Sequence, residues 1–326
     1  MNFRLQLAPS ELAEAAAMVR EHHANGTSLL PIGRASRLAR HLEGTTTDCE
    51  SLSTISVAGC DRIIEINPAE QTCVVEAGVS PLQLGQAVAE YGLELGVICP
   101  NQAEGTIGGI FMAPEISLYR GKWGNPREQV LSADWILADG STITTGARVV
   151  KSVAGYDLTR LILGSRGQLA LCTQLCLRLR TRPRYSVWLS LPLSCGEQLP
   201  DPRFLELLFS CQNGDCYWLR ADELAITPAP AMTMHSPEEG NEALQQVLSD
   251  FAGSPRRFTS SKLSDLDPGL GAVDFLGRQQ ACQLQPASLS NLGSSFPRTF
   301  EMPWLEQIRS AICPTATHFG GAGVTA

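Results

Sequence analysis

Two glycine-containing stretches have the composition of ligand-binding loops. The first is Gly33–Arg37 (GRASR), which follows the short apolar run Ser28–Ile32. The second is Glu104–Gly109 (EGTIGG), which holds three glycines within five residues. Glycine lets backbone N–H groups approach an anion closely because it has no Cβ. An ordinary turn explains the first stretch equally well, and a lone cluster like the second is weak evidence.

The residue types that most often bind metals or transfer protons form no recognisable site. Cys211 and Cys216 have no second pair at zinc or iron–sulfur spacing, so no metal site is predicted among the 11 cysteines. We interpret the cysteines as reduced thiols, mostly in the core. An isolated His235 or His318 is more often structural than a base, so no catalytic residue is predicted.

Composition restricts the class of protein. With 326 residues, 44% hydrophobic and 18% charged, the chain predicts a globular protein of two domains. A net charge of -8 and a pI of about 5.2 disfavour binding to nucleic acid. Neither a signal peptide nor a run of roughly 20 apolar residues is found, which predicts a cytoplasmic protein without a transmembrane segment.

Short helices and strands must position the two glycine stretches. Helices are predicted at Ser10–Ala24 with Ser10 as N-cap, at Pro81–Tyr91 with a capping box of Ser80 and Gln83, and at Leu158–Leu163 with Asp157 as N-cap. Strands are predicted at Ser28–Ile32, Ile63–Ile66, Thr72–Ala77, Trp135–Ala138, Thr142–Thr144 and Leu169–Leu179. Asp139–Gly140 predicts a hairpin. The alternation in Leu169–Leu179 indicates a half-buried strand, and Val149–Thr173 indicates a compact βαβ corner.

The chain changes character at Thr181–Arg184, where we predict a domain boundary. Beyond it the residues are richer in Pro, Ser and Gly, and periodicity is weaker. Helices are predicted at Leu199–Cys211, Asn241–Phe251 and Pro303–Ile312, and strands at Tyr185–Leu191 and Cys216–Leu219.

Four stretches, in order between Leu29 and Leu179, resemble the motifs of one flavoprotein family. Pro31–Leu38 (PIGRASRL) resembles a pyrophosphate loop of pattern P-[IV]-G-G-G-[TS]-x-L, and Glu104–Gly109 resembles a second flavin loop. Tyr119–Val130 is similar to an arginine-containing segment, and Val149–Thr173 to the V-K-N-V-A-G-Y-D signature. The family is that of vanillyl-alcohol-oxidase or PCMH-type FAD-binding domains. Within it, the similarity is greatest to the FAD-binding subunits of glycolate oxidase.

This resemblance implies an α+β fold: a PCMH-type FAD-binding domain of two α+β subdomains at 1–182, followed by a small α+β cap domain at 183–326. It also implies non-covalent FAD, clamped by backbone N–H groups of both glycine loops, with the adenine against the strand after Gly167. The cofactor-binding residues implied are Gly33, Arg34, Ala35, Ser36, Arg37, Pro100, Glu104, Gly105, Thr106, Gly108, Gly109, Lys151, Gly155, Tyr156, Gly167, Leu171 and Cys172.

The sequence departs from the family pattern at several places, among them Ser152, which replaces the usual Asn, and Glu104, which puts a negative charge near the expected phosphates. Arg34 and Ala35 replace two glycines of the pyrophosphate loop, and Ala170 replaces a later signature glycine. If Arg34 has a positive φ, the strain amounts to about 1–2 kcal/mol. An arginine beside a diphosphate would recover part of this through a charge-assisted contact.

Two main hypotheses follow. The first is an FAD-binding redox subunit of a glycolate oxidase-like complex that oxidises a small 2-hydroxy acid. Its implied partners are a larger flavoprotein subunit and an iron–sulfur subunit, which would also hold it peripherally at the inner membrane. The second is a structural subunit that keeps the fold without the cofactor, as the replaced glycines suggest. A free-standing hydroxy-acid dehydrogenase is a third, weaker alternative because no acid or base is identified.

Overall fold

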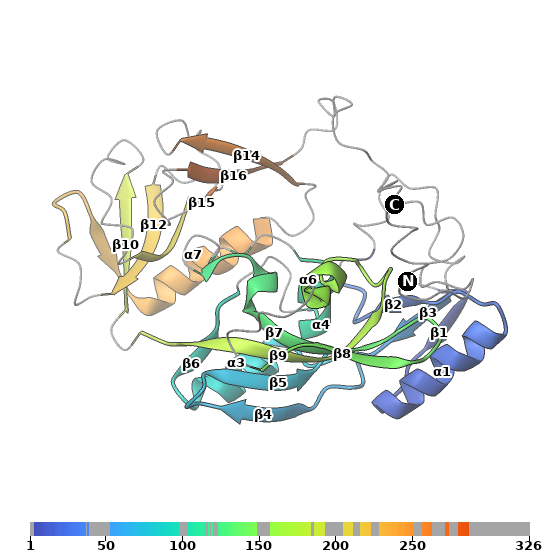
Figure 1. The fold of residues 1–326 in the computed structure, drawn as a ribbon. Coiled ribbons are helices and arrows are strands. Elements are labelled where there is room, and N and C mark those ends of the chain that lie inside the picture. Colours follow the sequence, from blue (N-terminus) through green and yellow to red (C-terminus); the bar gives the residue numbers. More distant parts are fainter. Residues whose placement is uncertain are drawn as a thin grey trace.

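A computed structural model shows how these segments are arranged (Figure 1). The structure describes residues 3–36, 38, 53–97, 104–114, 117, 119, 123–148, 157–183, 186–192, 205–210, 216–222, 228–250, 256–262, 271–273 and 280–286. A larger N-terminal part, drawn in blue to green, carries sheets of its own, and a smaller C-terminal part carries others.

A small parallel sheet begins the chain. Its elements are β1 (Leu5–Leu7), α1 (Leu12–Ala24), β2 (Leu30–Ile32) and β3 (Ser53–Ser56). Strand β3 lies between β1 and β2 and is parallel to both. The predicted N-cap at Ser10 is wrong: the cap residue is Glu11, which makes no side-chain cap. The Ser10 N–H instead donates to Glu14 Oε2 at 2.9 Å, so the residue before the helix is held by a side chain from its first turn.

A six-stranded sheet forms the second subdomain. Its strands are β4 (Ile63–Asn67), β5 (Thr72–Glu76), β6 (Leu93–Leu95), β7 (Val130–Ile136), β8 (Thr142–Gly146) and β9 (Leu171–Thr181). The order is β4–β5–β9–β7–β8, and β6 also pairs with β9. The predicted β4–β5 and β7–β8 pairs are both confirmed as antiparallel neighbours. Because β8 and β9 both run antiparallel to β7, they are parallel to each other.

Helical segments pack on this sheet. They are α3 (Pro81–Ala89), α4 (Ile107–Met112), the 3-10 helix η2 (Pro126–Gln129) and α6 (Leu158–Ile162). The Asp157 cap of α6 is confirmed, since its Oδ1 accepts from Arg160 N at 2.9 Å. Helix α6 connects the parallel strands β8 and β9, with β7 between them. The first strand of the βαβ corner predicted at Val149–Thr173 lies outside the described residues.

The capping box predicted for α3 is only half present. Ser80 Oγ accepts from Gln83 N at 3.1 Å, as predicted. The Gln83 side chain does not return to Ser80 but donates from Nε2 to the carbonyl of Asp61 at 3.3 Å. The segment before β4 thus offers an acceptor that is not evident from the sequence around Gln83.

Strand β9 is the centre of the larger sheet, between β5 and β7. Its odd-numbered side chains are buried, which confirms the alternation; Leu175 and Leu177 are both 0% exposed. On the opposite face Cys172 and Cys176 are buried as well, although the sequence predicts only one buried face. Gln174 on the same face is half-buried.

A buried carboxylate links the two subdomains. Glu76, at the end of β5, is only 1% exposed and accepts hydrogen bonds from Arg62 N, Nε and Nη2 at 2.9, 3.1 and 2.8 Å. The same guanidinium lies 3.6 Å from Glu11, beside α1. A buried carboxylate needs this many partners, because an unpaired charge away from water is costly.

The C-terminal part holds two smaller sheets. Strands β10 (Ser186–Pro192), β11 (Leu205–Ser210), β12 (Cys216–Asp222) and β13 (Thr233–His235) lie in the order β11–β12–β10–β13, followed by α7 (Pro237–Asp250). Strands β14 (Arg256–Lys262), β15 (Gly271–Val273) and β16 (Gln280–Pro286) form the other sheet. The predicted helix Leu199–Cys211 is wrong where it is described, because β11 pairs with β12. Pro303–Ile312 lies outside the described residues.

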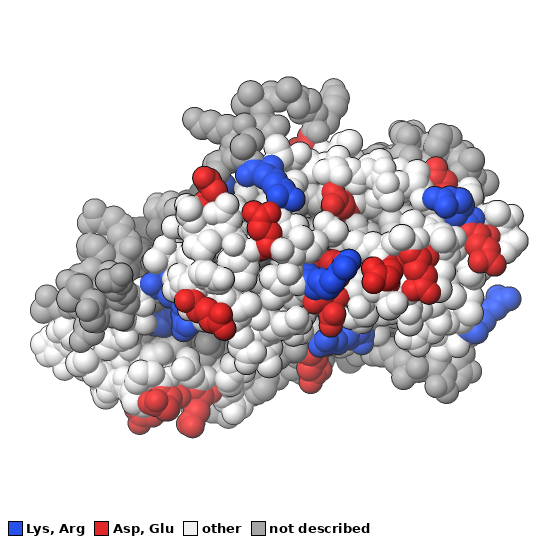
Figure 2. Space-filling view, turned by 90° about the horizontal axis from the view of Figure 1, so that it is seen from below, with Lys and Arg blue, Asp and Glu red and all other residues white. Residues whose placement is uncertain are grey.

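Charge is spread over the surface. Figure 2 shows acidic and basic side chains interspersed on the face seen from below. Among the residues that the structure describes, no helix is both long enough and apolar enough to cross a membrane.

Candidate functional site

The first glycine loop offers free backbone donors. Gly33 directly follows β2, and its carbonyl accepts from Ser56 Oγ at 2.9 Å, which ties the loop to β3. Within the described residues, the N–H groups of Gly33, Arg34 and Ala35 have no acceptor. The left-handed residue is Ala35, with a φ of 55°, so the strain expected at Arg34 is located one residue later. A left-handed residue in such a turn aims successive N–H groups to one side, as anion-binding nests do.

The second half of the second glycine loop, Ile107–Gly109, uses its backbone donors internally. Ile107 N donates to the carbonyl of Val79 and Gly108 N to that of Ala77, both at 2.8 Å. Gly109 N donates to Thr106 Oγ1 at 3.1 Å, so Thr106 caps α4. A Cβ on Gly108 would lie 2.7 Å from the Ala77 side chain. Gly108 therefore lets α4 pack closely on the chain after β5, and the N–H groups of Gly108 and Gly109 are not free for a ligand.

The structure brings three of the predicted stretches together. A Cβ on Gly33 would lie 2.4 Å from Thr106 Oγ1, so the two glycine loops touch. A Cβ on Gly167 would lie 3.0 Å from Pro31, just before the first loop. Arg34 and Ser36 are exposed beside this junction, and so is Glu104, while Gly105 is buried.

The beginning of β9 adds an unpaired strand edge. Leu171 and Cys172 pair with Ile136 and Trp135 of β7 on one side. On the other side β5 pairs only from Gln174 onward, and Ala77 N donates to Thr173 O at 2.8 Å. Within the described residues, no strand pairs with Leu171 or Cys172 on that edge. Burial raises the pKa of the Cys172 thiol, so it is an unreactive core group.

Five of the predicted cofactor residues cannot be placed. Arg37, Pro100, Lys151, Gly155 and Tyr156 lie outside the described residues.

The surroundings of His235 can be compared with the prediction that it is structural and not a catalytic base. Its Nε2 lies 2.7 Å from Ser190 Oγ, and its ring packs against Trp218 with centroids 4.4 Å apart. Its Nδ1 lies 3.6 Å from Glu239 Oε2. The residue thus packs within the C-terminal sheet and α7, consistent with a structural role.

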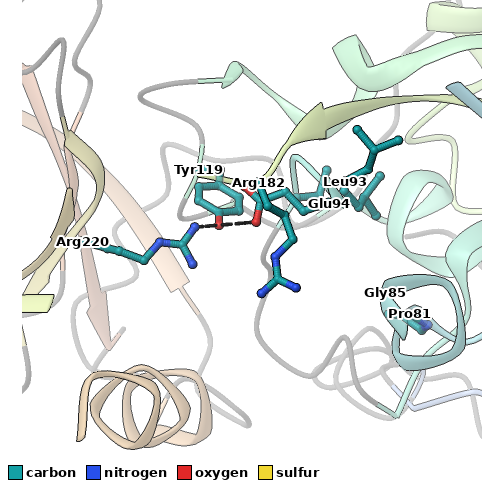
Figure 3. Close-up of a pocket in the computed structure, with 9 residues that line it drawn as sticks. Pro81, Gly85, Leu93, Glu94, Tyr119, Arg182 and Arg220 are labelled. Carbon is teal, nitrogen blue, oxygen red and sulfur yellow. Dashed lines mark hydrogen bonds and ion pairs between the residues drawn. The ribbon is translucent and has the colours of Figure 1, made fainter. Parts of the chain in front are cut away.

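A second polar cluster, which the sequence does not indicate, joins the N-terminal part to the C-terminal sheet. Arg220 of β12 donates from Nη2 to the hydroxyl of Tyr119, and Nη2 lies 3.7 Å from Glu94 Oε2 (Figure 3). The Tyr119 hydroxyl in turn donates to Glu94 Oε2 at 3.4 Å. These residues are far apart in the sequence, and only their proximity in the fold reveals the cluster.

Comparison with known proteins shows a similarity in the N-terminal part of the chain. The family described as FAD binding domain matches residues 4–146. The match confirms the predicted α+β fold class of the PCMH type and FAD as the cofactor of this domain. Part of the predicted set of donors fits a bound FAD. The first loop presents free N–H groups where the two glycine loops are in contact.

Named relatives share part of this chain. The glycolate oxidase subunit GlcE of Escherichia coli is 29% identical over 57% of the chain and 52% of its own length. The mitochondrial D-lactate dehydrogenase [cytochrome] of Arabidopsis thaliana is 28% identical over 71% of the chain and 42% of its own length. The chain thus spans about half the length of these relatives or less. A solved alkyldihydroxyacetonephosphate synthase shares the fold, with a TM-score of 0.54 and 14% identity over 75% of this chain and 50% of that one.

Proposed function

We propose that the chain is an FAD-linked oxidoreductase subunit that oxidises a small 2-hydroxy acid within a glycolate oxidase-like complex. The observation that carries the proposal is the contact between the two glycine loops, where Gly33, Arg34 and Ala35 present three unpaired N–H groups. The relatives named for glycolate and D-lactate support the substrate class. The partners proposed are a larger flavoprotein subunit and an iron–sulfur subunit.

In this proposal the chain's own residues hold and orient the cofactor. The free N–H groups of the first loop bind the pyrophosphate, and Arg34 adds a charge-assisted contact. The unpaired edge of β9 at Leu171 and Cys172 receives the adenine through main-chain groups. FAD, when bound, supplies an acceptor for two electrons. The division into an FAD-binding domain at 1–182 and a cap at 183–326 is part of the proposal.

The direct test is a visible absorption spectrum of the purified protein before and after FAD is added. We expect flavin absorbance that stays with the protein through gel filtration. A colourless sample after both steps would contradict the proposal and favour a cofactor-free structural subunit.

A pair of variants tests the first loop itself. Ala35→Gly removes a Cβ beside the three N–H groups, so closer approach should tighten FAD binding by roughly threefold to tenfold. The matched control is Gln71→Gly, because Gln71 has a similar φ of 52° but lies in the β4–β5 turn. Equal FAD affinity in the Ala35→Gly variant and the wild type, measured by fluorescence titration, would mean that this loop does not bind the pyrophosphate.

A further inference from the structure

A buried serine outside the predicted cofactor residues holds the first glycine loop. Ser56 ends β3 opposite Ile32, and only 6% of the residue is exposed. Its Oγ donates to the carbonyl of Gly33 at 2.9 Å and accepts from Ala58 N at 3.3 Å. Because the contact with Ala58 uses a lone pair of the hydroxyl, its single proton is left for the Gly33 carbonyl.

The contact with Ser56 ends the regular alternation of β2. Consecutive carbonyls of an extended strand point to opposite sides. The carbonyl of Ile32 accepts from Val57 N at 3.2 Å, so it points toward the chain that continues β3. The next carbonyl, that of Gly33, would point away from β3 in an extended chain. It points back to Ser56 instead, so the chain turns into the loop at this peptide.

The direction of the Gly33 carbonyl sets the direction of the next backbone donor. In a planar trans peptide, the C=O and the N–H point to opposite sides. Holding the Gly33 carbonyl on Ser56 therefore aims the N–H of Arg34 away from β3. Within the described residues, this N–H has no acceptor.

The second glycine loop closes the other side of Gly33. A Cβ on Gly33 would lie 2.4 Å from Thr106 Oγ1 and 3.1 Å from Thr106 Cγ2. The Thr106 side chain is itself fixed, because its Oγ1 accepts from Gly109 N at 3.1 Å. Gly33 is thus held between Ser56 on one side and Thr106 on the other.

We propose that Ser56 is a positioning residue for the first loop: its hydroxyl holds the Gly33–Arg34 peptide so that the Arg34 N–H faces a bound diphosphate. Ser56 acts through this peptide and not by contact with the ligand. This role rests on the proposed function, in which the loop binds the diphosphate of FAD. Without the hydroxyl the peptide is free to rotate, and the Arg34 N–H faces the ligand for only part of the time.

The test compares two variants that each remove one buried hydroxyl from β3. Ser56→Ala removes the contact with Gly33. The matched control is Thr54→Val, because Thr54 is 0% exposed and its Oγ1 donates to the carbonyl of Leu5, on β1, at 3.3 Å. Both variants should lose stability in urea denaturation. Only Ser56→Ala should bind FAD less tightly, by about threefold to tenfold in fluorescence titration of the full chain.

A second ligand and a third variant separate positioning from general destabilisation. ADP carries a diphosphate without a flavin ring, so calorimetric titration with ADP should show a similar fold-loss of affinity in Ser56→Ala. Ser56→Thr keeps a hydroxyl, and threonine suits a strand, so this variant should bind FAD as tightly as the wild type.

Equal FAD affinity in the wild type and Ser56→Ala would overturn the role of Ser56 and leave the proposed function intact. An equal loss of FAD affinity in Thr54→Val would also overturn it, because any weakening of the small sheet would then have the same effect. If the wild type binds no FAD, the proposed function fails, and the ADP titration decides the role of Ser56 separately. In that case, ADP binding that is absent from the wild type, or equal in the wild type and Ser56→Ala, would overturn it.

Discussion

Two glycines of the N-terminal part occupy opposite surroundings, and the difference sets what each position tolerates. At Gly108 a Cβ would lie 2.7 Å from the side chain of Ala77 and 3.0 Å from its carbonyl oxygen. At Gly85, inside α3, a Cβ would meet no atom within 4 Å. The first glycine is therefore needed for close packing, while the second only weakens a helix.

Alanine substitutions at these glycines should change stability in opposite directions. Gly108→Ala should lower the free energy of unfolding by about 1–3 kcal/mol, because the backbone of α4 must move away from Ala77. Gly85→Ala should raise it by about 0.5–1 kcal/mol, because alanine restricts the unfolded chain. Chemical denaturation of both variants measures this. A Gly108→Ala variant as stable as the wild type would contradict the packing argument.

The buried thiol of Cys73 should make stability depend on alkaline pH. Burial raises the pKa of Cys73 from 9.0 to about 12, and the nearby Cys176 adds to the shift. Between these two values the unfolded chain has lost the proton that the folded chain keeps. The contribution of this thiol to the free energy of unfolding is fully present below pH 9 and is lost as the pH rises toward 12. Over that window the free energy of unfolding should fall by about 1.4 kcal/mol per pH unit for this thiol.

Cys73→Ala isolates this contribution. We expect the variant to be less stable at neutral pH, because it loses a buried side chain, but its free energy of unfolding should fall less steeply above pH 9 than that of the wild type. Urea denaturation at pH 7 to 10.5 gives both curves. Parallel curves would show that Cys73 does not titrate differently in the folded and unfolded chain.

At the residue scale, the sequence predicts where the glycine loops are but not how they are used. Glycine composition alone identifies Gly33 and Gly108 as positions of close approach. The N–H groups of Gly108 and Gly109 are used in internal hydrogen bonds. For Gly108 this depends on a tertiary contact, because its acceptor is the carbonyl of Ala77, in the chain after β5. The cluster of Glu94, Tyr119 and Arg220 has no sequence signal for the same reason.

Among the elements, helix caps provide a direct comparison between two serines. Ser80 Oγ accepts from Gln83 N, whereas Ser10 makes no side-chain cap for α1. Ser80→Ala should therefore cost about 1 kcal/mol of stability. Ser10→Ala should change stability by less than about 0.5 kcal/mol. Thermal denaturation of the two variants compares them, and equal losses would mean that the Ser80 cap contributes nothing.

Elements with strong local signals are predicted correctly, and those without them are not. The β7–β8 hairpin, the Asp157 cap and the strand pair β4–β5 depend on turn and cap residues within a few positions. The segment of β11 resembles a helix locally, yet pairing with β12 makes it a strand, because long-range partners override propensity. The second buried face of β9 likewise depends on its central place between β5 and β7.

For the whole molecule, the hydrophobic core indicates where the chain can be divided. Every residue of the core cluster lies between Ala15 and Leu179, so the described N-terminal part has a core of its own. A fragment of residues 1–182 should therefore unfold cooperatively when followed by circular dichroism. A gradual, non-cooperative transition in the fragment, with a cooperative one in the full chain, would show that the C-terminal part is required for folding.

The position of β9 has a consequence for biosynthesis. As the chain leaves the ribosome, the β4–β5 and β7–β8 hairpins can form early because their partners are close in sequence. The ladders that join them, β5–β9 and β7–β9, need the strand Leu171–Thr181, which emerges after all the other strands of the sheet. Until then, the edges of β5 and β7 are open to pairing with other chains. Nascent chains stalled before Leu171 should thus depend most on chaperones, and those stalled well beyond Thr181 much less.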